Sequence, residues 1–273
     1  GNEQFLINGD NNYDDYLGMS VIILYYDNRE ENELVSLYVP ENKNQTVIID
    51  SDDIMREKSG VTSIWAQGDK IKEYCISQDA AFIYNGISAL YINDSDICVN
   101  EGHIILINND SDQEYETVKI FSLESTVIKQ LSETGSRIVG KNDIVYDLDE
   151  LLNENAGTMI DADGNKISFS KLKKGDTISF GYEKNTQKVI FAQKGKKVSG
   201  EIESIIDGES ISIDGTEYKM NHSFKTQKSG YTLDNIGVGM GVTVYIDAAD
   251  KIVGIEVTTN IELYGYMTKL YID

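Results

Sequence analysis

The chain has 273 residues, of which 40% are hydrophobic and 26% charged. This composition is typical of a folded protein and excludes general disorder. Asp and Glu outnumber Lys and Arg by 46 to 24, and the formal net charge of -22 argues against nucleic acid or an anionic membrane surface as a partner. The carboxylate excess suits a surface protein in a cation-rich medium, and it equally serves solubility. No apolar run reaches the roughly 18 to 20 residues that span a bilayer, so we expect no membrane insertion in this segment.

The first third of the chain predicts strands. Residues 16–40 read as a hairpin, because their apolar residues are mostly β-branched or aromatic and the middle, 27–33, is polar. Residues 46–50 predict a short strand, and 51–58 one or two helical turns capped by Ser51 or Asp52. Segments 62–77 and 80–93 alternate with period two and are interrupted at 67–69 and at Asn85-Gly86, a strong hairpin signal.

The remainder also predicts strands, with one short helical stretch. Residues 102–120 form a hairpin with an acidic turn, and 122–139 form two strands around a turn at 133–136. Residues 146–157, which end in Gly157, are one of the few stretches with helical character. Residues 158–193 predict consecutive strands, followed by a closing unit of strands at 198–257.

A hairpin pattern recurs four times along the chain. Each copy has a glycine, an apolar residue three positions later, a polar turn and a return strand; the glycines are Gly18, Gly102, Gly175 and Gly241. The spacing is irregular, so a strict solenoid is excluded. The alternative is that glycine is the usual punctuation before a strand in any β-rich protein.

Few residues suggest chemistry. The glycines of 237–241 precede a strand pattern, whereas a dinucleotide fingerprint requires a helix there. His103 and His222 have no Ser or Cys partner at a diagnostic spacing, so we assign them no catalytic role. Cys75 and Cys98 are too few for a cysteine zinc site, and the sequence leaves open whether they form a disulfide or two separately buried thiols.

The acidic turn is the one candidate metal site. It places oxygen ligands on alternate residues, as calcium loops do: Asn108, Asp110, Asp112 and Glu114. It lacks the glycine expected at the sixth position, and Lys119 stands where the bidentate Glu belongs. The alternative interpretation is a solvated hairpin tip. The shorter cluster in DADGN, at 161–165, reads as an ordinary type I turn.

Most of the chain resembles the β-rich modules of S-layer homology (SLH) repeat-bearing surface proteins of Gram-positive bacteria. The segments that carry the resemblance, in order, are AAFIYNGISALY, GHIILINNDSDQEYETVKIFS, IDADGNKISFSKLKKGDTISF, VSGEIESIIDGESISIDGTEYKM and VTVYIDAADKIVGIE. The resemblance implies a secreted, extracellular, cell-wall-associated modular protein whose anchoring repeats and signal peptide lie outside this segment. It implies no catalytic residues, and the family's acidic turn has more aspartates and a glycine, from which Asn108, Asn109, Gln113 and Glu116 depart.

We therefore expect an all-β protein of tandem small barrel or sandwich domains with very little helix. The predicted domains are 1–121, with longer loops, 122–195 and 196–262, and 263–273 begins a truncated further unit. The expected function is that of a non-catalytic structural or adhesive module, a spacer or interaction surface for a cell-wall polymer or a neighbouring surface protein. The alternative is a carbohydrate-binding module attached to a cell-wall hydrolase, because 17 tyrosines and Trp65 offer surfaces on which sugars stack. We expect no cofactor other than the candidate calcium.

Overall fold

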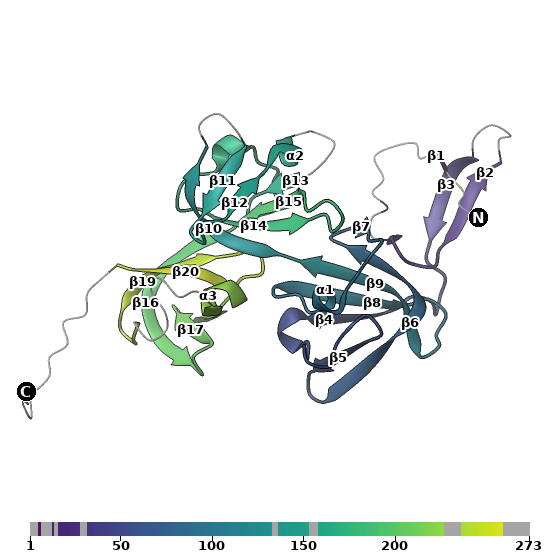
Figure 1. Cartoon of the computed structure of the whole chain (residues 1–273), viewed down its shortest axis with the longest axis horizontal. Coiled ribbons are helices and arrows are strands. Elements are labelled where there is room, and N and C mark those ends of the chain that lie inside the picture. Colours follow the sequence, from purple (N-terminus) through teal and green to yellow (C-terminus); the bar gives the residue numbers. More distant parts are fainter. Residues whose placement is uncertain are drawn as a thin grey trace, which may run out of the picture. The chain divides into compact units, whose positions relative to one another are not determined.

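The computed structural model describes residues 5–6, 13, 16–27, 32–132, 136–152, 158–226 and 236–258. Strands make up most of this part of the chain, and the helices are one turn long (Figure 1), so the all-β prediction is confirmed. The chain forms two compact units, 1–124 with 181–190 and 125–180 with 191–273. The division into domains at 121, 195 and 262 stays a prediction.

A large sheet dominates the first unit. Its strand order is β4-β8-β9-β6-β5, and β7 pairs with β6 at the side. The strands are β4 (Gln45–Asp50), β5 (Ser63–Gln67), β6 (Ile71–Tyr84), β7 (Ile87–Ser88), β8 (Gly102–Asn108) and β9 (Glu114–Ser122). Neighbours are antiparallel except β6 and β9, which run parallel. One face packs into a core that includes the fully buried Ile64, Ile104 and Leu106.

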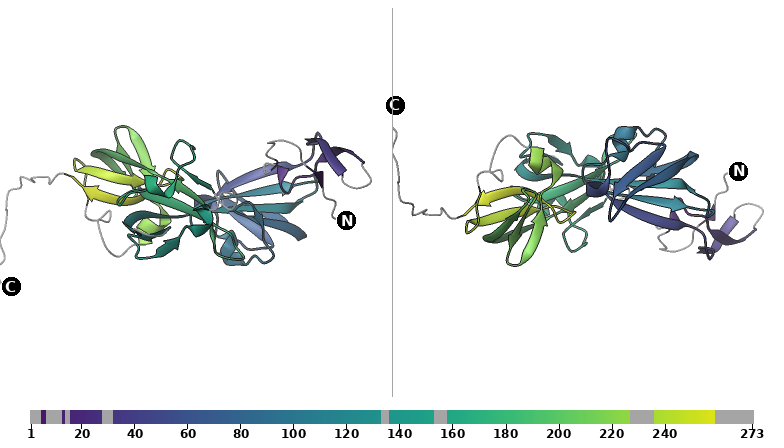
Figure 2. Two further views of the ribbon diagram at one scale, coloured as in Figure 1. Left: turned by 90° about the horizontal axis from the view of Figure 1, so that it is seen from above. Right: turned by 90° about the horizontal axis from the view of Figure 1, so that it is seen from below.

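A separate small sheet lies at the start of the first unit. Strands β2 (Ile22–Tyr26) and β3 (Asn32–Tyr38) form the antiparallel hairpin that the sequence predicts, and β1 (Phe5–Leu6) pairs parallel with β3. In Figures 1 and 2 this purple hairpin extends away from the large sheet of its unit. No residue of β2 or β3 is buried, because each is either exposed or intermediate in exposure.

A sheet with the order β12-β11-β10-β14-β15-β13 follows along the chain. Its strands are β10 (Glu124–Leu131), β11 (Arg137–Gly140), β12 (Val145–Asp147), β13 (Thr158–Ile160), β14 (Thr177–Tyr182) and β15 (Val189–Lys194). The two strands expected at 122–139 are therefore present. Phe180, fully buried, stacks on Tyr146 with ring centroids 4.4 Å apart. The pairing of β13 with β15 is parallel, so the strands of 158–193 do not form simple successive hairpins.

The last sheet has the order β18-β17-β16-β19-β20. Its strands are β16 (Lys196–Ile206), β17 (Ser210–Ile213), β18 (Thr216–Lys219), β19 (Gly241–Ile246) and β20 (Ile252–Val257). Alternate residues such as Ile202, Val242 and Val244 have no exposed surface and form the core beneath α3 (His222–Thr226). The glycines at 237–241 lead into a strand, in agreement with the exclusion of a dinucleotide fingerprint.

Two local predictions need correction. Residues 51–58 contain a single 3-10 turn, η2 (Ser51–Asp53), and its cap is Asp50, whose carboxylate accepts from the Asp52 N–H, not Ser51 or Asp52. Helix α1 (Asp94–Ile97) was not predicted, although the Asn93 capping box at its start is a recognisable signal. The remaining one-turn helices are α2 (Asp149–Leu152) and η3 (Phe169–Lys171).

Gly157, the predicted stop of the helical stretch, lies outside the described residues. In the part of the chain that the structure describes, no helix has the length and apolar character needed to cross a membrane.

The two cysteines are free thiols. Cys75 is exposed and Cys98 is half-buried, so neither alternative, a disulfide or two separately buried thiols, describes the pair. Burial raises the pKa of the Cys98 thiol, and the positive charge of Arg56 opposes this shift.

Candidate functional site

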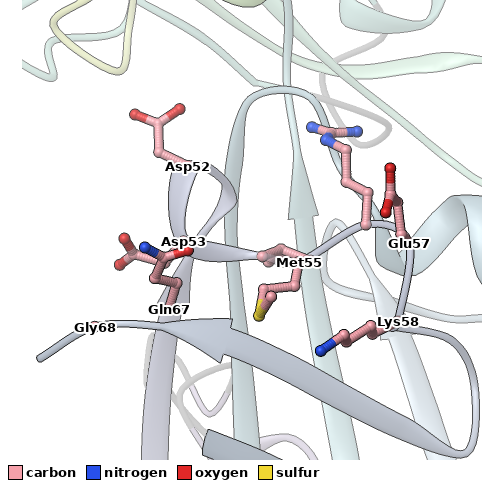
Figure 3. Close-up of a pocket in the computed structure, with 9 residues that line it drawn as sticks. Asp52, Asp53, Met55, Glu57, Lys58, Gln67 and Gly68 are labelled. Carbon is pink, nitrogen blue, oxygen red and sulfur yellow. The ribbon is translucent and has the colours of Figure 1, made fainter. Parts of the chain in front are cut away.

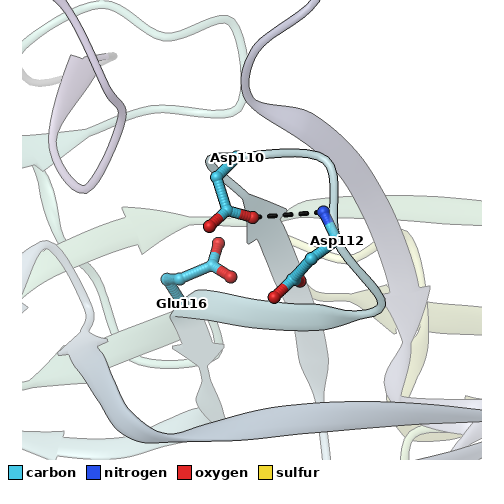
Figure 4. Close-up of side chains that lie close together, drawn as sticks. All are labelled: Asp110, Asp112 and Glu116. Atoms are coloured by element: carbon cyan, nitrogen blue, oxygen red, sulfur yellow. Dashed lines mark hydrogen bonds between the residues drawn. The ribbon is translucent and has the colours of Figure 1, made fainter.

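Three carboxylates converge at the acidic turn between β8 and β9. Oxygen atoms of Asp110, Asp112 and Glu116 lie within 4.8 Å of one another, and Figure 4 shows the side chains directed toward a common point. Backbone N–H groups orient all three: Asp112 N donates to Asp110 Oδ1 at 3.1 Å, Glu114 N donates to Asp112 Oδ1 at 2.7 Å, and Asn109 N donates to Glu116 Oε2 at 2.5 Å. Hard oxygen ligands of this kind suit Ca²⁺.

The cluster shares only two residues with the predicted ligand set. Asn108 is buried, and its side chain holds the turn together by donating to Asp112 O at 2.8 Å and accepting from Ser111 N at 2.6 Å. Glu114 starts β9 and pairs with Cys75 of β6, and Glu116 takes its place in the group of three. Calcium binding at this turn therefore stays a prediction.

The acidic turn is tied to the base of the small hairpin. Ser111 Oγ donates to Asn42 O at 3.0 Å, and Asn109 Nδ2 donates to Gly18 O at 3.3 Å. Gly18 O also accepts from Thr117 Oγ1 at 2.8 Å. These bonds hold the segments that enter and leave the hairpin against β9 and the turn that precedes it.

The hairpin base is closed by a second set of bonds. Asn44 accepts from Ser20 N and donates to Ser20 O, both at 2.7 Å. An amide side chain bonded to both backbone groups of one residue replaces a missing strand pair. The base is therefore fixed while the strands beyond it remain exposed.

One face of the hairpin is apolar and open. Ile22, Leu24 and Tyr26 alternate along β2 and so share one side of the sheet, and Tyr38 lies on that side because it pairs with Ile22. We call Ile22, Leu24, Tyr26 and Tyr38 the apolar hairpin face. Their exposed fractions are 39%, 50%, 67% and 46%. Contiguous apolar surface of this kind marks interaction sites in soluble proteins.

A shallow pocket of about 680 Å³ lies beside β5. It is lined by residues 52–58 with Gln67 and Gly68, and Figure 3 shows Met55 and Lys58 below the outward-pointing Asp52. Its two cations are already engaged: the guanidinium of Arg56 donates to the carbonyls of Cys98 and Val99 at 2.7 Å, and Lys58 Nζ lies 5.2 Å from the Trp65 ring. These contacts give the basic side chains structural roles, and they cover the one tryptophan with an ammonium group.

The two histidines lie in different elements. His103 stacks on Phe121 with centroids 4.7 Å apart, and burial lowers its pKa although Asp50 opposes the shift. His222 is the first residue of α3.

Neither a protein-family model nor a curated protein matches this chain. Function must therefore be argued from the residues and their geometry.

Proposed function

We propose that this chain is a non-catalytic adhesive module of a secreted, cell-wall-associated protein, and that it acts as a spacer that presents an interaction surface. The apolar hairpin face is the observation that carries the proposal. Leu24 and Tyr26 are 50% and 67% exposed beside each other on one strand, and a partner surface would bury them together.

The chemistry of this face favours a protein partner. Ile22 lies opposite Tyr38 at one end of the face, Tyr26 lies at the other end, and Leu24 lies between them along β2. Mixed aliphatic and aromatic surface packs well against another protein, since its stabilisation comes from apolar area and shape. The anchoring of the hairpin base through Asn44 and Thr117 also keeps the face preorganised, which lowers the entropic cost of binding.

Carbohydrate binding is the second candidate. Its support is the exposure of four tyrosines, Tyr25, Tyr26, Tyr38 and Tyr91, at 42% to 81%. Sugars stack on flat aromatic rings, and tyrosine supplies a hydroxyl as well. Against it, Tyr26 and Tyr38 lie at opposite ends of the hairpin face, so they do not form one continuous stacking platform.

Adsorption to purified Gram-positive cell walls tests the proposal. Walls that retain their surface proteins are compared with walls stripped by protease, and the intact protein is compared with the Leu24→Ser/Tyr26→Ser variant. We expect the intact protein to bind unstripped walls and not stripped walls. We expect the variant to bind unstripped walls at least tenfold more weakly. Thr46→Ser, an exposed change on β4, is the matched control.

The outcomes separate the candidates. Equal binding to stripped walls that depends on the tyrosines favours the carbohydrate-binding module. Absence of binding to either preparation contradicts the adhesive role. Because both substituted residues are exposed, the variant should keep its free energy of unfolding within about 0.5 kcal/mol, so a loss of binding reports on the surface.

A further inference from the structure

Strand β2 is the outer edge of the small sheet. The strand order is β1-β3-β2, and β3 is the strand that pairs with β2 in the part of the chain that the structure describes. Alternate backbone N–H and C=O groups of an edge strand point away from its neighbour. The outer side of β2 therefore offers a template on which one more strand can pair.

The sequence of this edge lacks the charges that usually protect one. Exposed edge strands are blunted by charged side chains, by proline or by a register irregularity. Residues 16–26 (YLGMSVIILYY) contain no charged residue and no proline. The one such device present is the register slip against β3 between Leu24 and Tyr25. Because β2 has only five residues, a strand added here would be short, and its side chains must contribute to binding.

Apolar side chains lie on both sides of this edge. Ile22, Leu24 and Tyr26 belong to the apolar hairpin face, whereas Ile23 and Tyr25 point to the opposite side. Tyr25 is 42% exposed, and Ile23 is intermediate in exposure. Alternate side chains of an added strand would contact one side or the other. A segment with apolar residues at successive positions therefore fits this edge best.

The acidic turn lies beyond one end of the edge. β2 begins at Ile22, and the carbonyl of Gly18, four residues earlier, accepts from Asn109 Nδ2 of the turn. Four residues of extended chain span at most about 14 Å. A partner strand that continues past Ile22 in this direction therefore brings its end close to the turn.

Both ends of the edge carry negative charge. The turn holds the three clustered carboxylates of Asp110, Asp112 and Glu116 (Figure 4), and the ammonium group of Lys43 donates to Asp110 O at 3.5 Å. Asp27, which follows β2, is exposed. This charge favours basic residues beside the apolar part of a partner strand. It disfavours a second copy of this chain, because pairing of two β2 edges in either direction would bring carboxylates together.

We infer that β2 binds an extended segment of a partner protein as an additional strand, and that the acidic turn binds a lysine or arginine at one end of that segment. The inference rests on the proposed adhesive function and specifies the chemistry of its partner. Backbone hydrogen bonds along β2 supply affinity, while the apolar and charged contacts supply specificity. The bonds of Asn44 and Thr117 fix the hairpin base before the partner binds.

Synthetic peptides added to the intact protein test the inference. The probes carry the apolar run Val-Ile-Val-Tyr-Val with three lysines at the N-terminus or at the C-terminus, because an added strand can run in either direction. At low salt with EDTA, we expect one of them to bind. Binding should weaken about tenfold when glutamates replace the lysines, and also when alternate peptide nitrogens are methylated. Hydrogen exchange in residues 20–27 should slow on binding, since amides of β2 become hydrogen-bonded.

A charge-neutral variant of the turn tests the basic end of the partner. Asp110→Asn/Asp112→Asn keeps side-chain oxygens that accept hydrogen bonds and removes two charges. We expect it to bind the lysine peptide about tenfold more weakly and to discriminate less against the glutamate peptide. Asp53→Asn/Glu57→Gln is the matched control, because it removes two exposed charges beyond the other end of β4 and should bind like the wild type.

Failure of this inference differs from failure of the adhesive function. If the protein adsorbs to walls but binds neither lysine peptide, strand addition is overturned and the adhesive proposal stands. Peptide binding that is insensitive to N-methylation also overturns strand addition. So does self-association of the wild type through β2, which would make a second copy the occupant. Peptide binding with slowed exchange in 20–27 but without wall adsorption supports strand addition and contradicts the adhesive role.

Discussion

Asp147 shows how one exposed carboxylate both starts a helix and anchors a strand. Its Oδ1 accepts from Asp149 N, the first residue of α2, at 3.0 Å, and its Oδ2 accepts from Arg137 Nε on the neighbouring strand at 2.9 Å. The hydrogen bond from Asp149 N lowers the pKa of Asp147, and Arg137 lowers it further. Both partners favour the ionised form.

The lowered pKa of Asp147 predicts a pH dependence of stability. Because the folded state binds the proton less tightly than the unfolded state, the stabilisation is complete above the ordinary carboxyl pKa of about 3.9 and is lost as the pH falls through the folded value. We expect Asp147→Ala to lower the free energy of unfolding at pH 7 by about 0.5–1 kcal/mol. In urea titrations the difference should vanish in acid, and Asp147→Ser, which can still cap, should lose less. A difference that does not depend on pH would contradict this origin.

The three carboxylates at the acidic turn repel one another, which a divalent cation would relieve. If Asp110, Asp112 and Glu116 hold calcium, as the sequence predicts for this turn, millimolar calcium will raise the melting temperature of the wild type. The same calcium should have no effect on Glu116→Gln. Asp79→Asn, an exposed acid on β6, is the matched control and should respond like the wild type. Absence of a shift beyond that of magnesium at equal ionic strength dismisses the site.

The glycines that precede strands are the residues whose structural role the sequence predicts best. Gly18, Gly102 and Gly175 have φ values of +79°, +116° and +83°, which side chains rarely tolerate. In the fourth copy the positive φ is at Gly239 instead. At Gly102 a Cβ atom would also lie 1.9 Å from the Phe121 carbonyl oxygen. At three of the four repeated glycines, the backbone conformation itself therefore favours glycine.

At the level of elements, local signals predicted the hairpins and missed the long-range pairs. Asn85 and Gly86 have φ values of +49° and +84°, as the Asn-Gly turn between β6 and β7 requires. The parallel pairing of β6 with β9 joins distant segments, and its register slips between Ile76 and Ala81. No local pattern encodes such a pairing, because it depends on which apolar faces meet in the folded chain.

The same limit applies to the acidic turn. Alternation correctly placed Asp110 and Asp112 on one side of the turn, since both lie within a few residues of each other. Whether Glu114 or Glu116 joins them depends on the strand that follows. Glu114 pairs with Cys75 across β9 and β6, whereas the Glu116 carboxylate accepts a hydrogen bond from Asn109 N. Periodicity within the turn could not predict that choice.

The core of the β10–β15 sheet predicts a large effect for one aromatic side chain. Phe180 on β14 has no exposed surface and stacks on Tyr146 of β12 at an interplanar angle of 18°. Truncation to alanine removes the apolar contact and leaves a cavity, which costs about 3–5 kcal/mol. Denaturant unfolding should show this loss for Phe180→Ala and a smaller one for Phe180→Leu.

An exposed aromatic residue provides the control for Phe180. Tyr91 is 81% exposed, so Tyr91→Ala should change the free energy of unfolding by less than about 0.5 kcal/mol. Equal losses for Phe180→Ala and Tyr91→Ala would mean that the sheet between β12 and β14 does not form this core.

At the scale of the whole molecule, the net charge of -22 opposes compaction through self-repulsion. Several exposed ion pairs, such as Arg137 with Asp147 and Lys141 with Glu256, offset little of it, because exposed pairs contribute about 0–1 kcal/mol each. Sodium chloride screens the repulsion over a Debye length that falls from about 30 Å at 0.01 M to 10 Å at 0.1 M and 3 Å at 1 M.

We therefore expect the melting temperature to rise steeply with sodium chloride at low concentration and then to level off. Screening of long-range repulsion acts mostly below about 0.2 M, whereas the general effect of salt on apolar burial keeps growing with concentration. A rise of the melting temperature that occurs only at high salt would mean that salt acts through apolar burial and not through screening of charge. A fall in melting temperature would contradict the prediction, since it would mean that attractive ion pairs outweigh the repulsion among the 46 carboxylates.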